Sequence, residues 1–307
     1  MKTFIITDSW DVTSDIVVYR LGDDVFRLNT DLIRDYKIEW LETGFQIWDP
    51  TGRSLMLCEI GSVYWRKPFS SQLYDDISSP DYFFYSECRY LIRELYNVAT
   101  SSGAFALVEA GAERRLGKIY QLLIAKHHFR VPKWRVTLGY EYSAPAGTIA
   151  KSLSGEQVDI DNAFDTTRID EKTLDPSYVW LTQEAIDKTS DVTVCYVEGK
   201  LFAFELTAAA GVTDWRTTIG SPEMQRWRPI PLPDEITKSI RTFMVRCALR
   251  FGRLDFVTAG GELVFLEVNP NGQWAWLDLD DTTGLITTMV AAIRGNARPR
   301  SADSPAT

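Results

Sequence analysis

The strongest constraint on the fold comes from two short apolar stretches near the C-terminal end of the sequence. Leu254–Val257 and Leu263–Val268 have the length and the β-branched and aromatic content of buried strands. Ala259-Gly260-Gly261 lies between them, and a glycine pair at such a position is typical of a tight hairpin turn. We therefore predict two antiparallel strands that belong to a larger sheet.

Three oxygen-bearing side chains belong to this hairpin. Residues two apart on a strand project from the same face, so Glu267 and Asn269 point together, and Leu266 and Val268 are expected to face the core. Asp255 lies at the start of the first strand, where pairing can bring it near Glu267. Carboxylate and amide oxygens are the ligands that Mg²⁺ requires, and two adjacent carboxylates repel each other unless a cation neutralises them. The hairpin thus predicts a magnesium site; the alternative is a row of solvent-facing polar residues.

The composition excludes several classes of protein. The 307 residues include 33 basic and 42 acidic ones, and the net charge of −9 argues against nucleic acid as the main partner. No apolar stretch is long enough to span a membrane, and Asp8 interrupts the only apolar segment at the N-terminus, so a cytoplasmic protein is expected. Two adjacent histidines, His127 and His128, offer little for a zinc site or a histidine-based triad. The four cysteines are far apart and are expected to be free thiols: Cys58, Cys88, Cys195 and Cys247.

Further residues could bind an anionic ligand. Lys151 ends an apolar strand before a loop of small residues, and Lys118 lies on a helix expected at about 113–128. Gln183-Glu184 closes a strand whose backbone could hydrogen-bond a purine. Two clusters, Tyr64–Pro68 and Asp214-Trp215-Arg216, combine tryptophan with arginine, whose fork binds phosphate or carboxylate. The alternatives are solvated lysines, a helix start at Gln183, and tryptophans that cover arginine stems.

The order of these residues resembles the ATP-grasp superfamily. Four segments are more narrowly similar to the peptide-macrocyclising ligases of microviridin and other graspetide pathways: Val63–Pro68, Lys118-x-x-Gln121-Leu122, Val131-Pro132 and Phe265–Trp274. The resemblance covers nearly the whole chain and implies an α/β protein with the ATP-grasp fold, in which two lobes enclose ATP. The implied parts are an N-terminal α/β domain at 1–110, a central lobe at 111–184, a C-terminal lobe at 185–294 and a flexible tail at 295–307.

The resemblance also implies a role for each candidate residue. Lys118 and Lys151 would contact the phosphates of ATP, and Gln183 and Glu184 would lie at the adenine-binding hinge. Asp255, Glu267 and Asn269 would hold two Mg²⁺ ions. Arg216 would steady the γ-phosphate or the acyl-phosphate formed from it, and with Lys151 it forms the expected catalytic pair.

The implied activity is that of an ATP-dependent carboxylate ligase that forms ADP. Such enzymes phosphorylate an Asp or Glu side chain of a ribosomal precursor peptide. A Thr or Ser hydroxyl then gives an ester ring, or a Lys amine gives an amide. The family also implies binding of a leader segment outside the active site, and a homodimer.

The sequence departs from the family pattern at three places. Gly117 stands where asparagine is usual, Thr193 stands where arginine is usual, and the segment between Thr137 and Lys151 is short. Two other functions therefore stay open. One is a ligase that joins free amino acids or extends a protein C-terminus, and the other is a non-catalytic member that binds nucleotide or peptide.

Overall fold

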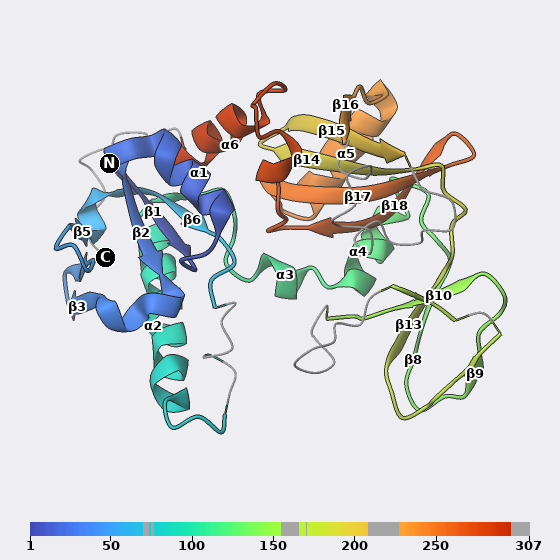
Figure 1. Cartoon of the computed structure of the whole chain (residues 1–307), viewed down its shortest axis with the longest axis horizontal. Helices are drawn as coiled ribbons and strands as arrows, with labels where there is room; N and C mark the ends of the chain where they lie inside the picture. Colours follow the sequence, from blue (N-terminus) through green and yellow to red (C-terminus); the bar gives the residue numbers. More distant parts are fainter. Residues whose placement is uncertain (70–73, 75–76, 155–165, 170, 208–226, 296–307) are drawn as a thin grey trace. The chain divides into compact units, whose positions relative to one another are not determined.

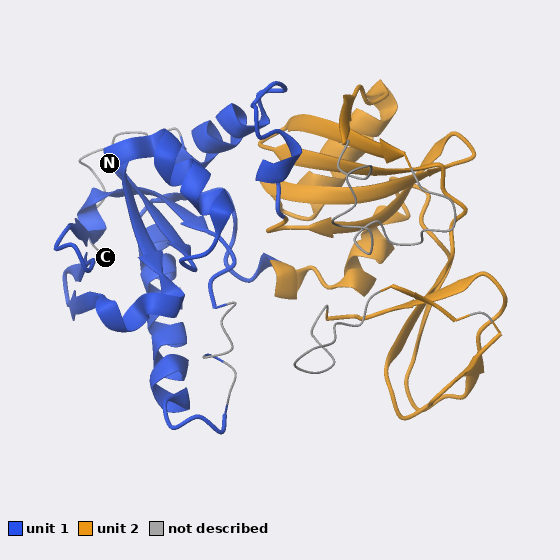
Figure 2. Cartoon of the chain, in the orientation of Figure 1, with its two compact units in different colours: residues 1–112, 273–307 blue, residues 113–272 orange. Residues whose placement is uncertain are grey.

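The structure is a computed structural model that describes residues 1–69, 74, 77–154, 166–169, 171–207 and 227–295. The chain forms two compact units (Figures 1 and 2). Unit 1 comprises Met1–Ala112 together with the described part of Gln273–Thr307, and unit 2 comprises Glu113–Gly272. No helix in the described ranges has the length and hydropathy needed to cross a membrane.

Unit 1 is built on a parallel four-stranded sheet in the order β2-β1-β6-β7 (Figure 1). Its strands are β1 (Lys2–Thr7), β2 (Val25–Asn29), β6 (Ile60–Trp65) and β7 (Phe105–Ala106). The helices are α1 (Val12–Leu21), α2 (Tyr82–Ser101) and α6 (Leu285–Arg294), with short 3₁₀ turns at Gly22–Asp24, Thr30–Asp35, Leu57–Glu59 and Ala275–Leu277. A smaller antiparallel sheet consists of β3 (Lys37–Leu41), β4 (Gly44–Trp48) and β5 (Ser54–Met56).

The tryptophan–arginine cluster on β6 is part of the core of unit 1. Arg66 is fully buried, and its Nε lies 3.5 Å from Oδ1 of Asp11, the residue that also caps α1 by accepting from Ser14 N. The indole Nε1 of Trp274 donates to the Tyr64 hydroxyl at 3.2 Å. Two segments that carry the family resemblance therefore meet although they are 210 residues apart in sequence. These contacts favour a structural role for the tryptophan–arginine cluster on β6.

Unit 2 contains two larger antiparallel sheets and a two-stranded ribbon. The first sheet has the order β11-β10-β13-β8 and the second has the order β16-β15-β14-β17-β18; β12 pairs with β9. The first sheet and the ribbon consist of β8 (Trp134–Thr137), β9 (Tyr142–Ser143), β10 (Thr148–Lys151), β11 (Thr167–Arg168), β12 (Thr173–Leu174) and β13 (Trp180–Glu184). The second consists of β14 (Ser190–Val197), β15 (Lys200–Thr207), β16 (Arg228–Ile230), β17 (Phe251–Ala259) and β18 (Glu262–Asn269).

The core of unit 2 lies between the five-stranded sheet and its helices. The helices are α4 (Lys118–Ala125) and α5 (Asp234–Arg246), and the short helix α3 (Ala112–Arg115) begins at the last residue of the N-terminal segment of unit 1. Rings of Phe129, Phe243, Phe256 and Phe265 pack with centroids 5.3 to 5.6 Å apart, so one face of the β17–β18 hairpin is covered. The polar residues Asp255 and Glu267 lie on the opposite face of the hairpin. The predicted hairpin is confirmed, with Gly260 and Gly261 in its turn at φ values of 60° and 81°, where glycine is unstrained.

Three local predictions need correction. The helix expected at 113–128 is broken into α3 and α4, because Gly117 has extended backbone and precedes the first residue of α4. Asp255 lies in the middle of β17 rather than at its start. Leu266 does not face the core: the register of β17 and β18 shifts next to Asp255, and this bulge turns Leu266 toward the polar face.

The domain division expected at 1–110, 111–184, 185–294 and 295–307 stays a prediction. Helix α6, which it assigned to the C-terminal lobe, is grouped with unit 1. The expectation of free thiols is confirmed for all four cysteines.

Candidate active site

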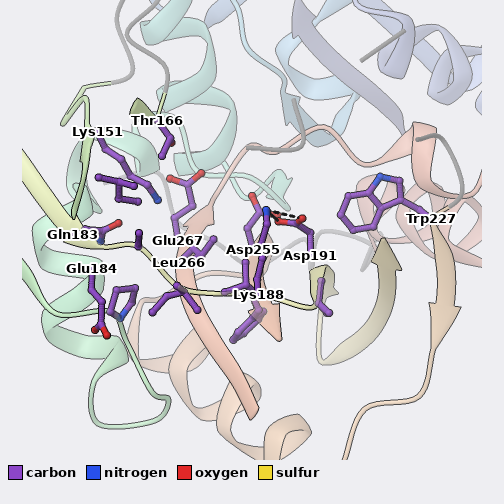
Figure 3. A pocket seen from close by; sticks show the side chains of 17 residues that line it. Lys151, Thr166, Gln183, Glu184, Lys188, Asp191, Trp227, Asp255, Leu266 and Glu267 are labelled. Atoms are coloured by element: carbon purple, nitrogen blue, oxygen red, sulfur yellow. Dashed lines mark hydrogen bonds and ion pairs between the residues drawn. The ribbon is translucent and has the colours of Figure 1, made fainter. Parts of the chain in front are cut away.

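One pocket of unit 2 brings together most of the residues expected to bind nucleotide and metal. Lys151 from β10, Gln183 and Glu184 from β13, Asp255 from β17 and Glu267 from β18 all line it (Figure 3). In that view Glu267 lies between Lys151 on one side and Asp255 on the other. These residues span 117 positions of the sequence, from 151 to 267. The pocket is thus formed by both larger sheets of this unit.

The two carboxylates face each other across adjacent strands. Asp255 pairs directly with Glu267 in the antiparallel register of β17 and β18. Side chains that are directly opposite in such a pair have Cβ atoms about 4.5–5.5 Å apart. Thr193 of β14 is opposite Asp255 on the other side and donates its hydroxyl to Oδ1 of Asp255 at 2.8 Å. The predicted proximity of Asp255 and Glu267 is therefore present in the structure.

Arg253 is a site residue that sequence analysis missed. Its Nη2 donates to Oδ2 of Asp255 at 3.0 Å, and its side chain is 9% exposed. Burial by itself lowers the pKa of the Arg253 guanidinium, but the carboxylate of Asp255 outweighs this effect and raises that pKa above its usual value. Arg253 therefore stays charged. Its position two residues before Asp255 is the signal that could have indicated it, because both side chains lie on one face of the strand.

The side-chain oxygens of this site suit Mg²⁺ that also binds a phosphate group. Asn269 lies two residues beyond Glu267 on the same face, and its Oδ1 accepts from Asn271 N at 3.0 Å, which orients the side chain. Within the described ranges no group of three or more histidine, cysteine, aspartate or glutamate residues could hold a metal ion. Mg²⁺ is commonly bound by one or two carboxylates, with substrate phosphates and water completing the octahedron. Asp255, Glu267 and Asn269 could supply such a partial set.

Other residues of the pocket lining combine apolar side chains with a buried acceptor. Ile186 and Leu266 both line it and pack against a cluster of buried apolar residues on the hairpin. Gln183 is 3% exposed, and no described residue donates to its buried Oε1. The side chain of Glu184 accepts from Lys133 N at 3.3 Å. Apolar walls with one buried, unsatisfied acceptor suit a flat ring that carries an amino group.

The two expected phosphate-binding lysines hold different positions. Lys151 lines the pocket, whereas Lys118 and Asn269 are outside its described lining. The Nζ of Lys118 donates to the backbone oxygen of Ser152 at 2.7 Å. Lys118 therefore contacts the residue that follows Lys151, and its role at the phosphates stays a prediction. Arg216 and its neighbours lie outside the described residues.

A second ion pair in the pocket was also missed. The Nζ of Lys188 lies 2.8 Å from both carboxylate oxygens of Asp191, and the two side chains are 8% and 9% exposed (Figure 3). Asp191 is on β14, two residues before Thr193, so it projects from the same face as the site residues of β17. Lys188 lies in the loop just before β14 and Asp191 lies on β14, so the conformation of this loop determines their distance. The pair adds buried charge to one wall of the pocket.

Gln121 of α4 forms a hydrogen bond with β18, the strand that carries Glu267 and Asn269. The amide N–H of Val268, which lies between Glu267 and Asn269, donates to Oε1 of Gln121 at 2.9 Å. The Nε2 of Gln121 donates to the backbone oxygen of Leu116 at 2.7 Å, and the side chain is 5% exposed. Because β18 is the edge strand of its sheet, α4 supplies a hydrogen bond that no further strand can supply.

We expect Gln121→Ala to lower the free energy of unfolding by about 2–3 kcal/mol, because it leaves a buried N–H and a buried carbonyl without this partner. Urea unfolding measures the change. The control is Tyr120→Ala, which alters the residue directly before Gln121 on α4. Tyr120 is 52% exposed, so this change should lower the free energy of unfolding by no more than about 0.5 kcal/mol. Equal losses in the two variants would contradict the positioning role.

Comparison with known proteins supports the fold. No family model matches the sequence, and no curated protein matches it either. The structure is similar to that of the macrocyclase MdnC bound with precursor peptide MdnA from Microcystis aeruginosa MRC, with a TM-score of 0.77, 23% identity, and coverage of 96% of this chain and 100% of that one.

Two further structures extend this comparison. A RiPP-associated ATP-grasp ligase from Chryseobacterium gregarium, in complex with ADP and a leader and core peptide, has a TM-score of 0.75, 20% identity, and coverage of 97% and 100%. The D-alanine–D-alanine ligase from Bacillus anthracis has a TM-score of 0.54, 12% identity, and coverage of 96% and 97%. The chain therefore has the ATP-grasp fold that these ligases share.

Proposed function

We propose that this protein is an ATP- and Mg²⁺-dependent, ADP-forming carboxylate ligase that acts on a ribosomally made precursor peptide. The observation that carries the proposal is the direct opposition of Asp255 and Glu267 in a pocket that also contains Lys151 and Gln183. Two carboxylates at such a distance are costly unless cations offset their charge. A pocket that combines this pair with apolar walls suits a metal-bound nucleotide.

Each residue then has a role at the nucleotide. Asp255, Glu267 and Asn269 would hold the Mg²⁺ ions, which neutralise charge on the phosphates. Lys151 would contact the phosphates, and Gln183 would accept from the amino group of adenine. Glu184 would lie at the hinge, Lys118 would support the phosphate contacts, and Arg216 would steady the phosphoryl group that is transferred.

The proposed reaction has two steps that balance. A carboxylate oxygen of a peptide Asp or Glu attacks the γ-phosphorus, and ADP leaves, so that an acyl-phosphate forms. A Thr or Ser hydroxyl then attacks the acyl carbon and loses its proton, and phosphate leaves; a Lys amine reacts in the same way to give an amide. The peptides bound in the MdnC and Chryseobacterium gregarium structures support a peptide partner here. A homodimer and a cytoplasmic location stay predictions.

Mass spectrometry of peptides treated with the purified protein, ATP and Mg²⁺ tests the proposal. The peptides to use are short ones encoded beside its gene that combine Thr, Ser or Lys with Asp or Glu. We expect the loss of one water for each ring formed, together with one ADP released. A gain of amino-acid mass would instead identify a ligase that joins residues. Nucleotide binding without ADP release across all peptides would identify a non-catalytic protein.

We expect Gln183→Leu to weaken ADP binding by about tenfold while raising the free energy of unfolding of the nucleotide-free protein by about 1 kcal/mol. The reason is that Gln183 Oε1 is buried without a described donor. This unsatisfied acceptor destabilises the nucleotide-free protein, and it would accept a hydrogen bond when the nucleotide is bound. Calorimetric titration with ADP and urea unfolding measure the two effects. Gln46→Leu, on β4 of unit 1, is the matched control and should leave ADP binding unchanged. Unchanged ADP affinity in Gln183→Leu would remove this residue from the nucleobase site.

A further inference from the structure

Arg253 is a buried cation that contacts one carboxylate of the pair directly. It lies on β17 two residues from Asp255, directly opposite Asn269 of β18. Its Nη2 lies 3.0 Å from Oδ2 of Asp255, while Thr193 donates to Oδ1. Protein donors therefore contact both oxygens of this expected metal ligand.

The stem of Arg253 is held in place by the turn that follows β18. A Cβ atom at Gly272 would come within 2.7 Å of the Cβ of Arg253, so only glycine allows this approach. Gly272 N also donates to the backbone oxygen of Asn269 at 3.2 Å. The turn that carries Asn269 thus packs directly on Arg253, and the guanidinium is confined next to Asp255 with 9% of its side chain exposed.

The charges of this face explain why a fixed cation is needed. Asp255 and Glu267 are opposite each other, and their mutual repulsion increases as water is excluded. The guanidinium of Arg253, in contact with Asp255, offsets part of this negative charge. The same contact has a second consequence, because a divalent cation that binds Asp255 must share or displace the bond from Arg253.

We propose that Arg253 is the built-in counter-cation of the carboxylate pair, which stabilises the pair without metal and competes with a divalent cation for Asp255. This inference rests on the proposed function, because it takes Asp255 and Glu267 as the metal-binding pair. Arg253 is in this respect a positioning residue. The free metal ion then binds weakly, and the carboxylates stay ordered when no ligand is present.

The test uses Mn²⁺ alone as the probe, with no nucleotide or peptide. We expect Arg253→Met, which keeps most of the apolar stem, to bind Mn²⁺ at least tenfold more tightly than the original protein in a calorimetric titration. We also expect its melting temperature to be lower without metal and to rise more steeply with MnCl₂. Arg253→Lys keeps the charge and should stay close to the original protein in both measurements. Arg250→Met, at an exposed arginine just before β17 whose side chain is 58% exposed, is the control and should change neither.

A double variant keeps the test decisive if Arg253→Met does not fold. Adding Glu267→Gln removes the repulsion that Arg253 offsets, so Arg253→Met/Glu267→Gln should recover most of the lost stability. Failure of this recovery, or Mn²⁺ affinity in Arg253→Met no higher than in the original protein, would overturn the proposal. Because metal binding is read without peptide, a chain that makes no peptide rings can still give tighter Mn²⁺ binding in Arg253→Met, so the two proposals fail separately.

Discussion

Glu267→Gln and Asp255→Asn are each expected to reduce ADP release in the presence of a substrate peptide by about a hundredfold or more. Each change keeps the size of the side chain and removes one of the two negative charges that face each other between β17 and β18. A neutral amide is a poorer Mg²⁺ ligand, and the triphosphate would lose part of the positive charge that the transferred phosphoryl group needs. A coupled assay of ADP release at saturating ATP measures the effect.

The control for this pair is Glu262→Gln on the same strand. Glu262 begins β18, its side chain is 68% exposed, and its carboxylate lies 3.3 Å from Nη1 of Arg130. The Glu262→Gln protein should retain nearly full activity, since an exposed ion pair contributes little to stability. The magnesium dependence gives a second readout, because Glu267→Asp should need more Mg²⁺ for half-maximal activity. A Glu267→Gln protein that keeps more than a tenth of the activity would contradict the assigned role of this carboxylate.

Local rules predict only part of the carboxylate pair. Alternation along a strand places Glu267 and Asn269 on one face. The glycine turn alone would place Asp255 opposite Leu266, and the bulge shifts the register so that Glu267 is opposite Asp255. The prediction failed at Leu266, since a bulge is one extra residue that alternation alone does not reveal. The same bulge gives the pocket an apolar wall beside the carboxylate.

Most partners of the site residues could not be predicted, because they depend on the register of three strands and on distant segments. Arg253 is the exception, since it lies two residues before Asp255 on the same strand. Arg253 and Thr193 reach Asp255 from its own strand and from β14, and no short-range pattern links Thr193 to a residue 62 positions away. Helix α2 (Tyr82–Ser101) is the opposite case, because the helical spacing of its apolar residues and the small residues that follow predict its range without any tertiary information. Local periodicity therefore located the elements and the ligands, whereas the charges around them needed the fold.

Loss of the Lys188–Asp191 ion pair is expected to cause the largest change in stability. Both side chains are at least nine-tenths buried, with Nζ 2.8 Å from the carboxylate oxygens. Lys188→Met should lower the free energy of unfolding by about 3 kcal/mol or more, because the carboxylate of Asp191 stays buried without its cationic partner. Urea unfolding of the nucleotide-free protein measures this loss separately from any effect on ATP binding.

A double-mutant cycle separates the ion pair from simple loss of packing. Lys188→Met/Asp191→Leu replaces both charges by apolar side chains and should be much closer in stability to the original protein than either single variant, since a buried pair often contributes little net stability. The exposed pair of Arg294 and Asp24, 61% and 54% exposed, provides the comparison, and Asp24→Asn should change stability by less than about 1 kcal/mol. If the losses of the two single variants simply add in the double variant, the two charges are not coupled, and the expected role of this ion pair is wrong.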